Sequence, residues 1–241
     1  MANPQSISLH ASGAETITGT GSSVDITSLR QAAKLTLEIT AVAGTTPTLV
    51  VAIQTSPSGA GSWQQVAAFA SQNAVGTIDL VTAKLSRFVR AVWTITGTLG
   101  QSFTFALTGT AHQLYVTPDQ AEQIAIPVAA LSTLSDQEKA AAAIRASDYA
   151  EGKIAGAFTM PITAWGDDVR GATADLYVWH ALSKRGFSPE GNELVLERKN
   201  DAIKWFGDVS AGRVKPPGII DATPDSYEAG SYVVTRPRRG W

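Results

Sequence analysis

The 241-residue sequence contains no cysteine. Disulfide frameworks, thiolate metal sites and cysteine nucleophiles are therefore excluded, while the redox compartment stays undetermined. No apolar run approaches the roughly 20 residues that a membrane helix needs, and the N-terminus lacks the basic and apolar regions of a signal peptide. A net charge of −2 gives no overall excess for binding nucleic acid or a membrane surface. We expect a soluble protein, made in the cytoplasm, without membrane contact.

Charge is also scarce in the first half of the chain, whereas charges of both signs are dense after residue 113. The first half is rich in Thr, Ser, Gly, Val and Ala, which is typical of half-buried strands and turns. The length exceeds the usual size of one domain, about 100–150 residues. We therefore predict a β domain over 1–113, a helical domain over 114–215 and an extended C-terminal tail over 216–241. The charged residues before 113 are Glu15, Asp25, Arg30, Lys34, Glu38, Asp79, Lys84, Arg87 and Arg90.

Period-2 alternation identifies the strands of the first half. Residues 34–40 place Leu35, Leu37 and Ile39 on one face and polar residues on the other. The clearest strand spans 87–95, and residues 97–100 turn the chain into the next one. Seven or eight short strands at regular spacing predict an antiparallel β-sandwich. The predicted strands are 7–10, 16–20, 34–40, 48–54, 63–69, 77–80, 87–95 and 102–108.

After Tyr115 the apolar period becomes helical. Thr117 followed by Pro118 predicts the start of a short helix that ends near residue 126. Ser135 and Glu138 have the spacing of a capping box before an alanine-rich helix to about residue 157. Two further helices are predicted over 165–184 and 189–210. The fold class is therefore α+β: an N-terminal sandwich, a small domain of about four helices and the tail.

The sequence shows no set of residues with the spacing of a catalytic or metal site. His10, His112 and His180 have no partner at a ligand spacing, so we expect surface or hydrogen-bonded histidines. Asp167 and Asp168 suit the first turn of a helix, where carboxylates complement the helix dipole. We therefore expect a protein that is not an enzyme and has no cofactor and no metal.

Two features favour binding to partner proteins. Charges at three- and four-residue spacings on the last helix are typical of a solvated face or of a salt-bridged contact between subunits; they are Glu197, Arg198, Asp201 and Lys204. The C-terminal segment ends in arginines and aromatic residues. It is either a solubilising end or a segment that docks on an acidic partner surface or contacts DNA phosphates. Its candidate docking residues are Tyr232, Arg236, Arg238, Arg239 and Trp241.

Several motifs of the second half occur in the order and spacing of a known family. The opening is Tyr-Val-Thr-Pro-Asp-Gln at 115–120. The alanine-rich helix ends at 148–158 with Asp-Tyr-Ala-Glu-Gly-Lys-Ile-Ala-Gly-Ala-Phe. The strongest match is Glu-Arg-Lys-Asn-Asp-Ala-Ile-Lys-Trp-Phe at 197–206, followed by Ala-Gly-Arg-Val at 211–214. On these residues the second half resembles the Mu-like head–tail connector (adaptor or head-completion) proteins of tailed bacteriophages. The long β domain in front is a departure from the family pattern.

The resemblance implies a structural virion protein at the head–tail junction. It would form a homo-oligomeric ring, twelvefold in such families, between the portal protein and the tail or tail-terminator protein. DNA would pass through the lumen without sequence-specific binding, and the β domain would contact the capsid or the tail. The alternative is a carbohydrate- or surface-binding sandwich, with Trp63 as its platform, attached to the virion through the helices.

Overall fold

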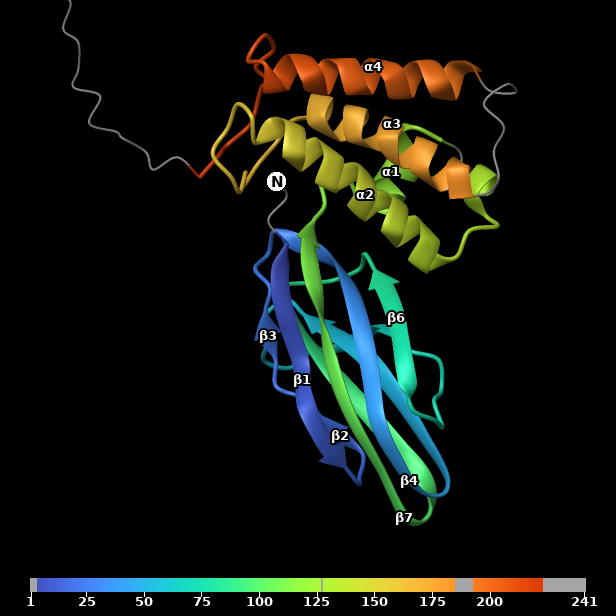
Figure 1. Cartoon of the computed structure of the whole chain (residues 1–241). Coiled ribbons are helices and arrows are strands. Elements are labelled where there is room, and N and C mark those ends of the chain that lie inside the picture. Colours follow the sequence, from blue (N-terminus) through green and yellow to red (C-terminus); the bar gives the residue numbers. More distant parts are fainter. Residues whose placement is uncertain (1–3, 127, 185–192, 223–241) are drawn as a thin grey trace, which may run out of the picture.

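The computed structural model describes residues 4–126, 128–184 and 193–222. Within these residues, strands run as far as Gln113 and four α-helices with one short 3-10 turn follow. Figure 1 shows the strands as an elongated body, with the helices stacked on one end of it. The predicted α+β class, with a β region first and helices after it, is confirmed.

Two very long strands form the centre of the sheet. β4 (Arg30–Ser56) and β7 (Phe88–Gln113) pair antiparallel along almost their whole length. Both bend at the same level, and Figure 1 shows the β4–β7 ribbon turning back at the end far from the helices. Positive φ angles allow the bend at Gly44, Thr46, Gly97, Leu99 and Gly100.

The shorter strands flank one half or the other of this ribbon. β1 (Gln5–Glu15) and β6 (Gly76–Thr82) flank the half made of 30–43 and 102–113. The other half, 45–56 and 88–98, is flanked by β2 (Gly19–Thr20), β3 (Val24–Asp25) and β5 (Gln64–Ala68). One hydrogen-bonded sheet is thus folded into two facing layers, an antiparallel β-sandwich.

Apolar side chains from both layers fill the space between them. Leu35 and Leu37 from one layer and Val51 and Ile53 from the other are at most 1% exposed, and they share one core cluster with Phe105. Burying each such side chain stabilises the fold by about 1.5–3 kcal/mol. Because neighbouring residues of a strand point to opposite faces, the Thr and Ser residues between them lie on the outside.

The first two helices begin at the predicted N-caps, Thr117 and Ser135. Both N-caps form capping boxes, which the sequence analysis predicted only at Ser135. α1 (Pro118–Ile124) follows Thr117, whose side chain accepts the N–H of Gln120. α2 (Asp136–Ile154) follows Ser135, which accepts the N–H of Glu138. A 3-10 turn (Val128–Leu131) lies between them. α3 (Asp167–Lys184) and α4 (Glu193–Ser210) complete the helical half.

The helices enclose a second apolar core, separate from that of the sandwich. α2 and α3 lie side by side and α4 covers them (Figure 1). Tyr177 and Phe206 are fully buried, and Trp165 and Trp205 pack against the cluster. Most of the aromatic residues of this half therefore serve packing.

The strands differ from the prediction in their lengths. The turn predicted at 97–100 lies inside β7, because β4 bends at the same level and the pairing resumes beyond it. Of the strand predicted over 16–20, only Gly19 and Thr20 pair with a neighbour.

Residues 216–222, predicted as the start of the tail, pack against the helical half. Ile220 forms an antiparallel bridge with Ala164, and Asp221 Oδ2 accepts the N–H of Thr159 at 3.1 Å. Pro216 is buried. The rest of the predicted tail, 223–241, lies outside the described residues.

Gly109 of β7 provides a test of the ribbon pairing. A Cβ at this position would clash with the carbonyl oxygen of Lys34 and would lie 3.0 Å from the Leu35 Cα. We expect Gly109→Ala to lower the free energy of unfolding by about 1–3 kcal/mol, as overpacking does. The matched control is Gly76→Ala in β6, where a Cβ meets nothing within 4 Å. Urea denaturation of both variants checks this, and equal stabilities would contradict the close approach.

Candidate interaction surfaces of the helical half and the junction

The two halves are joined by a short connector, residues 114–117, between β7 and α1. Leu114, Tyr115 and Val116 are at most 2% exposed. The Tyr115 N–H donates to Ser147 Oγ at 3.1 Å, and Trp165 Nε1 donates to the Tyr115 carbonyl at 2.9 Å. The connector is therefore part of the helical core and not a solvated linker.

Polar side chains also cross the junction. His112, at the end of β7, places Nδ1 3.0 Å from Asp148 Oδ1 of α2 and Nε2 3.0 Å from Thr110 Oγ1. Gln113 Nε2 donates to the Ile162 carbonyl at 2.8 Å in a buried site. These contacts orient the halves, because a buried polar group that loses its partner costs about 1–3 kcal/mol.

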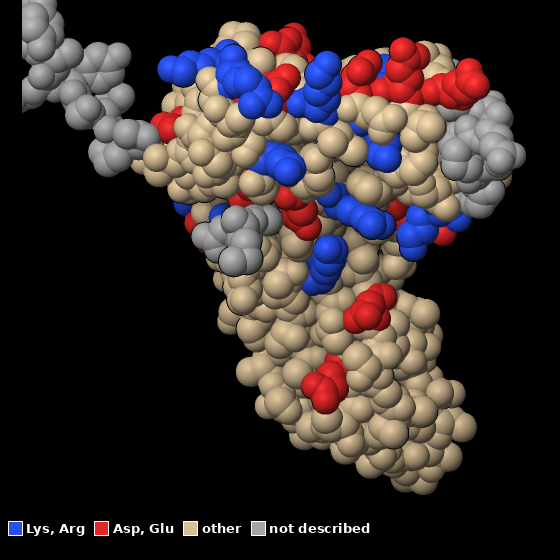
Figure 2. All heavy atoms as spheres, turned by 45° about the horizontal axis from the view of Figure 1, so that its top comes forward, with Lys and Arg blue, Asp and Glu red and all other residues tan. Residues whose placement is uncertain are grey.

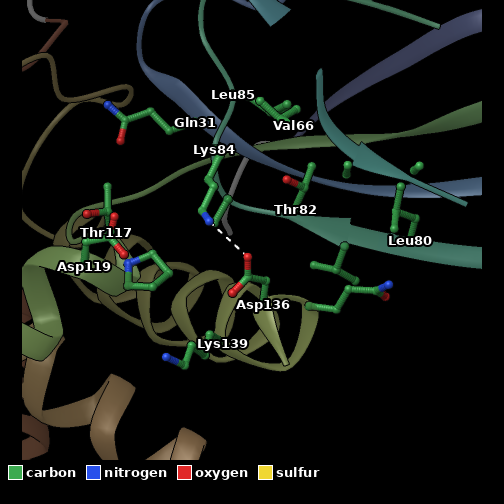
Figure 3. Close-up of a pocket in the computed structure, with 16 residues that line it drawn as sticks. Gln31, Val66, Leu80, Thr82, Lys84, Leu85, Thr117, Asp119, Asp136 and Lys139 are labelled. Carbon is green, nitrogen blue, oxygen red and sulfur yellow. Dashed lines mark hydrogen bonds and ion pairs between the residues drawn. The ribbon is translucent and has the colours of Figure 1, made fainter. Parts of the chain in front are cut away.

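An open crevice lies between the edges of β5 and β6 and the beginnings of α1 and α2 (Figure 3). Its volume is about 480 Å³, and its strand side is apolar, with Val66 and Leu80. Lys84, which follows β6, reaches across to Asp136 of α2 at 3.0 Å. The hydrogen bond to Asp136 and the charge of that carboxylate raise the pKa of Lys84. Because these charges balance each other, the crevice shows no clear preference for a ligand of one sign.

A second hollow, of about 580 Å³, lies between α2, the end of α3 and the outer face of β4. We call it the basic hollow, because its lining includes Lys34, Arg145 and Lys184 against one carboxylate, Asp148. That carboxylate already contacts His112 at 3.0 Å and Lys34 Nζ at 4.0 Å. No hydrogen bond or close ion pair links Arg145 or Lys184 to another described residue. Figure 2 shows basic residues around the junction.

His180 of α3 also lines the basic hollow. Its burial, together with the positive charges of Arg145 and Lys199, lowers the pKa of His180 to about 4. The imidazole is therefore neutral at pH 7, and the positive charge of the hollow comes from lysine and arginine.

The residues predicted to contact a neighbouring subunit lie on α4. Glu197, Asp201 and Lys204 are exposed. Arg198 is used inside the chain: Nη2 lies 2.8 Å from Asp175 Oδ1 of α3, and Nη1 donates to the Ala125 carbonyl at 3.1 Å. An inter-subunit role for this set stays a prediction. The residues predicted to dock on a portal, Tyr232, Arg236, Arg238, Arg239 and Trp241, lie outside the described residues.

The other candidates of the sequence have structural contacts. His10 stacks on Phe105, with ring centroids 4.3 Å apart. Trp63 is half-buried, and the guanidinium of Arg90 lies 4.1 Å above its ring. Sequence reasoning missed the basic hollow, because its cations come from separate elements and only their positions in the fold bring them together. The outward-facing place of Lys34 in an alternating strand was the one available signal.

A polar cluster ties three helices of the helical half together. Glu122 of α1, only 8% exposed, accepts the hydroxyl of Tyr177 at 3.2 Å and lies 2.9 Å from Lys139 Nζ of α2. By contrast, the buried hydroxyl of Tyr115 has no hydrogen-bond partner among the described residues. Burial raises the pKa of both phenols.

Within the described ranges, no group of three or more His, Asp or Glu residues is placed to hold a metal ion. None of the described helices is both long enough and apolar enough to span a bilayer.

Residues 109–234 match the profile of a protein family described as Bacteriophage Mu, Gp36. The match begins in β7, includes all four helices and covers more than half of the chain. No curated protein matches the sequence. A solved structure with some likeness is the crystal structure of PBSX exported protein XepA, with 16% identity and a TM-score of 0.29. The aligned part is 47% of this chain and 37% of that one, and at this TM-score the likeness carries no argument.

The two buried phenols give a matched pair of variants. Tyr115→Phe removes a hydroxyl without a partner, so we expect the free energy of unfolding to stay the same or to rise by up to about 1 kcal/mol. Tyr177→Phe removes the hydrogen bond to Glu122 and should cost about 1 kcal/mol. Thermal or urea unfolding of both variants measures the difference, and a destabilised Tyr115→Phe would show that its hydroxyl is satisfied.

His180 predicts a pH dependence of stability. Folding lowers its pKa from 6.5 to about 4, so the unfolded chain binds the proton first as the pH falls. The wild type should therefore lose stability progressively between pH 6.5 and about 4, and His180→Gln should lose less over the same range. Unfolding midpoints of both proteins at several pH values check this. Identical pH profiles would mean that His180 titrates normally in the folded chain.

Proposed function

The chain belongs to the bacteriophage Mu Gp36 family, and from that premise we propose that it is a head–tail connector (adaptor) of a tailed phage. It forms a ring between the portal protein and the tail, and it acts by binding, without catalysis, cofactor or metal. The observation that carries this proposal is the extent of the family match, which covers the helical half and most of the C-terminal segment. The sequence motifs of the resemblance, at 115–214, lie within this match.

The geometry suits such a role in two ways. A protein that joins two large assemblies has to keep its own parts in fixed relative positions. The buried residues 114–116 between β7 and α1 pack the two halves into one unit. A ring also needs lateral surfaces, and α4 exposes charged residues along its length. In this proposal the ring is twelvefold, DNA passes through its lumen without sequence-specific contacts, and the sandwich projects towards the capsid or the tail.

The carbohydrate-binding alternative has less support. Its platform would be Trp63, but the guanidinium of Arg90 covers one face of that ring. Two hydrogen bonds to Gln54 Oε1, at 2.9 and 2.8 Å, hold the guanidinium in place. A sugar would have to displace Arg90 to stack on that face. Glycan-array binding that disappears in Trp63→Ala would favour this alternative over the connector.

Electron microscopy of the purified full chain, together with antibody labelling of phage particles, tests the proposed location and assembly. We expect rings with a central channel, and label at the head–tail junction. Particles that lack the protein would overturn the connector assignment.

Truncation tests the role of the C-terminal segment. The cut belongs after Ala222, because Ile220 and Asp221 contribute contacts to the helical half. We expect the shortened chain to keep the unfolding midpoint of the full chain but to leave heads and tails unjoined, since Tyr232 and the arginines after it are removed. Complementation of a phage that lacks the gene measures this. Normal infectious yield would show that the segment does not dock on the portal.

A further inference from the structure

Two surfaces beside the helices each carry an excess of charge of one sign. One is the basic hollow of Lys34, Arg145 and Lys184. The other, which we call the acidic stripe, consists of Glu193, Glu197 and Asp201 on α4; all three are exposed. Residues four apart lie on the same face of a helix, so the three carboxylates form one row. No hydrogen bond or close ion pair joins them to a described cation.

The acidic stripe faces away from the rest of its own chain. α4 packs on its neighbours through Ala202, Phe206 and Val209, which are at most 4% exposed. At 100° per residue, these positions lie roughly opposite the stripe. The stripe therefore cannot turn into the basic hollow of the same molecule. Like charges at this spacing repel one another. The exposed Lys204, three residues after Asp201, offsets part of this repulsion, so the excess negative charge of the stripe lies at Glu193 and Glu197.

The basic hollow, in turn, carries an excess of positive charge. Its carboxylate, Asp148, is already in contact with His112 and Lys34. His180 is neutral at pH 7, so the excess positive charge comes from Lys34, Arg145 and Lys184. The stripe spans nine residues, and the eight steps between them cover about 12 Å along the helix axis. That length is comparable with the dimensions of a hollow of about 580 Å³.

We propose that the acidic stripe of one copy docks in the basic hollow of the next copy. This interface presupposes the ring proposed above and specifies its lateral contact. The two surfaces differ, so the contact is head-to-tail, and a repeated head-to-tail contact closes into a ring when its rotation permits. Complementary charge fixes the register of such a contact and speeds its formation.

A second copy suits the hollow better than DNA. The outer face of the sandwich next to Lys34 exposes Glu38, on the same face of β4, and Asp79, which accepts the hydroxyl of Thr36 at 2.8 Å. A duplex is about 20 Å wide and carries a negative charge every 1.7 Å or so along its axis, so it would extend over these carboxylates. The acidic stripe of a second copy is short enough to occupy the hollow without covering Glu38 and Asp79.

Charge reversal on each surface tests the contact in the full chain. The hollow variant is Arg145→Glu with Lys184→Glu, and the stripe variant is Glu197→Lys with Asp201→Lys. Each alone should weaken self-association at least about tenfold in sedimentation velocity. An equimolar mixture of the two should restore it, because each reversed surface then meets its opposite. Lys215→Glu, an exposed reversal outside both surfaces, is the matched control and should change nothing.

The wild type gives an independent measurement that needs no variant. Its self-association should weaken steeply as salt is raised from about 50 to 500 mM, since exposed charge pairs are screened. Salt-independent association, or a mixture no better than the single variants, would overturn the interface. Binding of duplex DNA is measured for the same proteins. If the wild type binds DNA and the hollow variant does not, while both associate normally, the hollow is a phosphate site and the proposed interface is wrong.

Phage complementation separates this interface from the proposed function. The hollow variant and the stripe variant should each fail to support infectious particles, and a chain carrying both reversals should recover. If the protein is present in particles and both single variants assemble normally, the interface is wrong while the connector assignment stands. If the wild type neither associates nor enters particles, both are wrong.

Discussion

The structure depends on the burial of residues 114–116. β7 passes from the sandwich into the helical core without a linker, and Leu114, Tyr115 and Val116 lie inside that core. A solvated linker would let the halves rotate independently, as the polar interfaces between domains usually permit. Here rotation would expose three large apolar side chains and break the hydrogen bonds of Tyr115 to Ser147 and Trp165. The end of the sandwich is therefore held against α2.

The surfaces at the junction are consequences of that constraint. Lys34 belongs to a strand and Arg145 to a helix, so the basic hollow exists only while the halves keep their relative position. The crevice beside β5 and β6 likewise needs α1 and α2 as its other wall (Figure 3). Loosening the junction would thus remove the hollow and the crevice before it unfolded either half. For this reason, substitutions at His112 or Gln113 should disturb these surfaces more than their small share of the total stability suggests.

Local sequence signals predicted the elements well, because each signal acts within a few residues. The N-cap and proline at Thr117 and Pro118, the capping box at Ser135 and the alternation of 35, 37 and 39 all correspond to the elements observed. The continuity of β4 and β7 through their bends could not be predicted, since it depends on two distant segments bending at the same level.

The candidate sites were harder to predict for the same reason. Arg198 looked like a surface charge, but its partners, Asp175 and the carbonyl of Ala125, come from other elements of the chain. The cations of the basic hollow are separated by up to 150 positions in sequence. Spacing along one helix shows which residues share a face. It does not show what another element brings to that face.

On α4, Arg198 and Lys199 contact the rest of the chain, whereas the carboxylates point to the outside. Arg198 faces the chain and neutralises Asp175, whose pKa is raised by burial. Lys199 lies 4.6 Å above the ring of Trp179, so it too is used within the chain. With these cations drawn inward, the outer face at 193–201 keeps only carboxylates and Asn200 among its exposed polar residues. The acidic character of that face therefore follows from how α4 packs on α3. A substitution that freed Arg198 would weaken both this packing and the excess negative charge of the outer face.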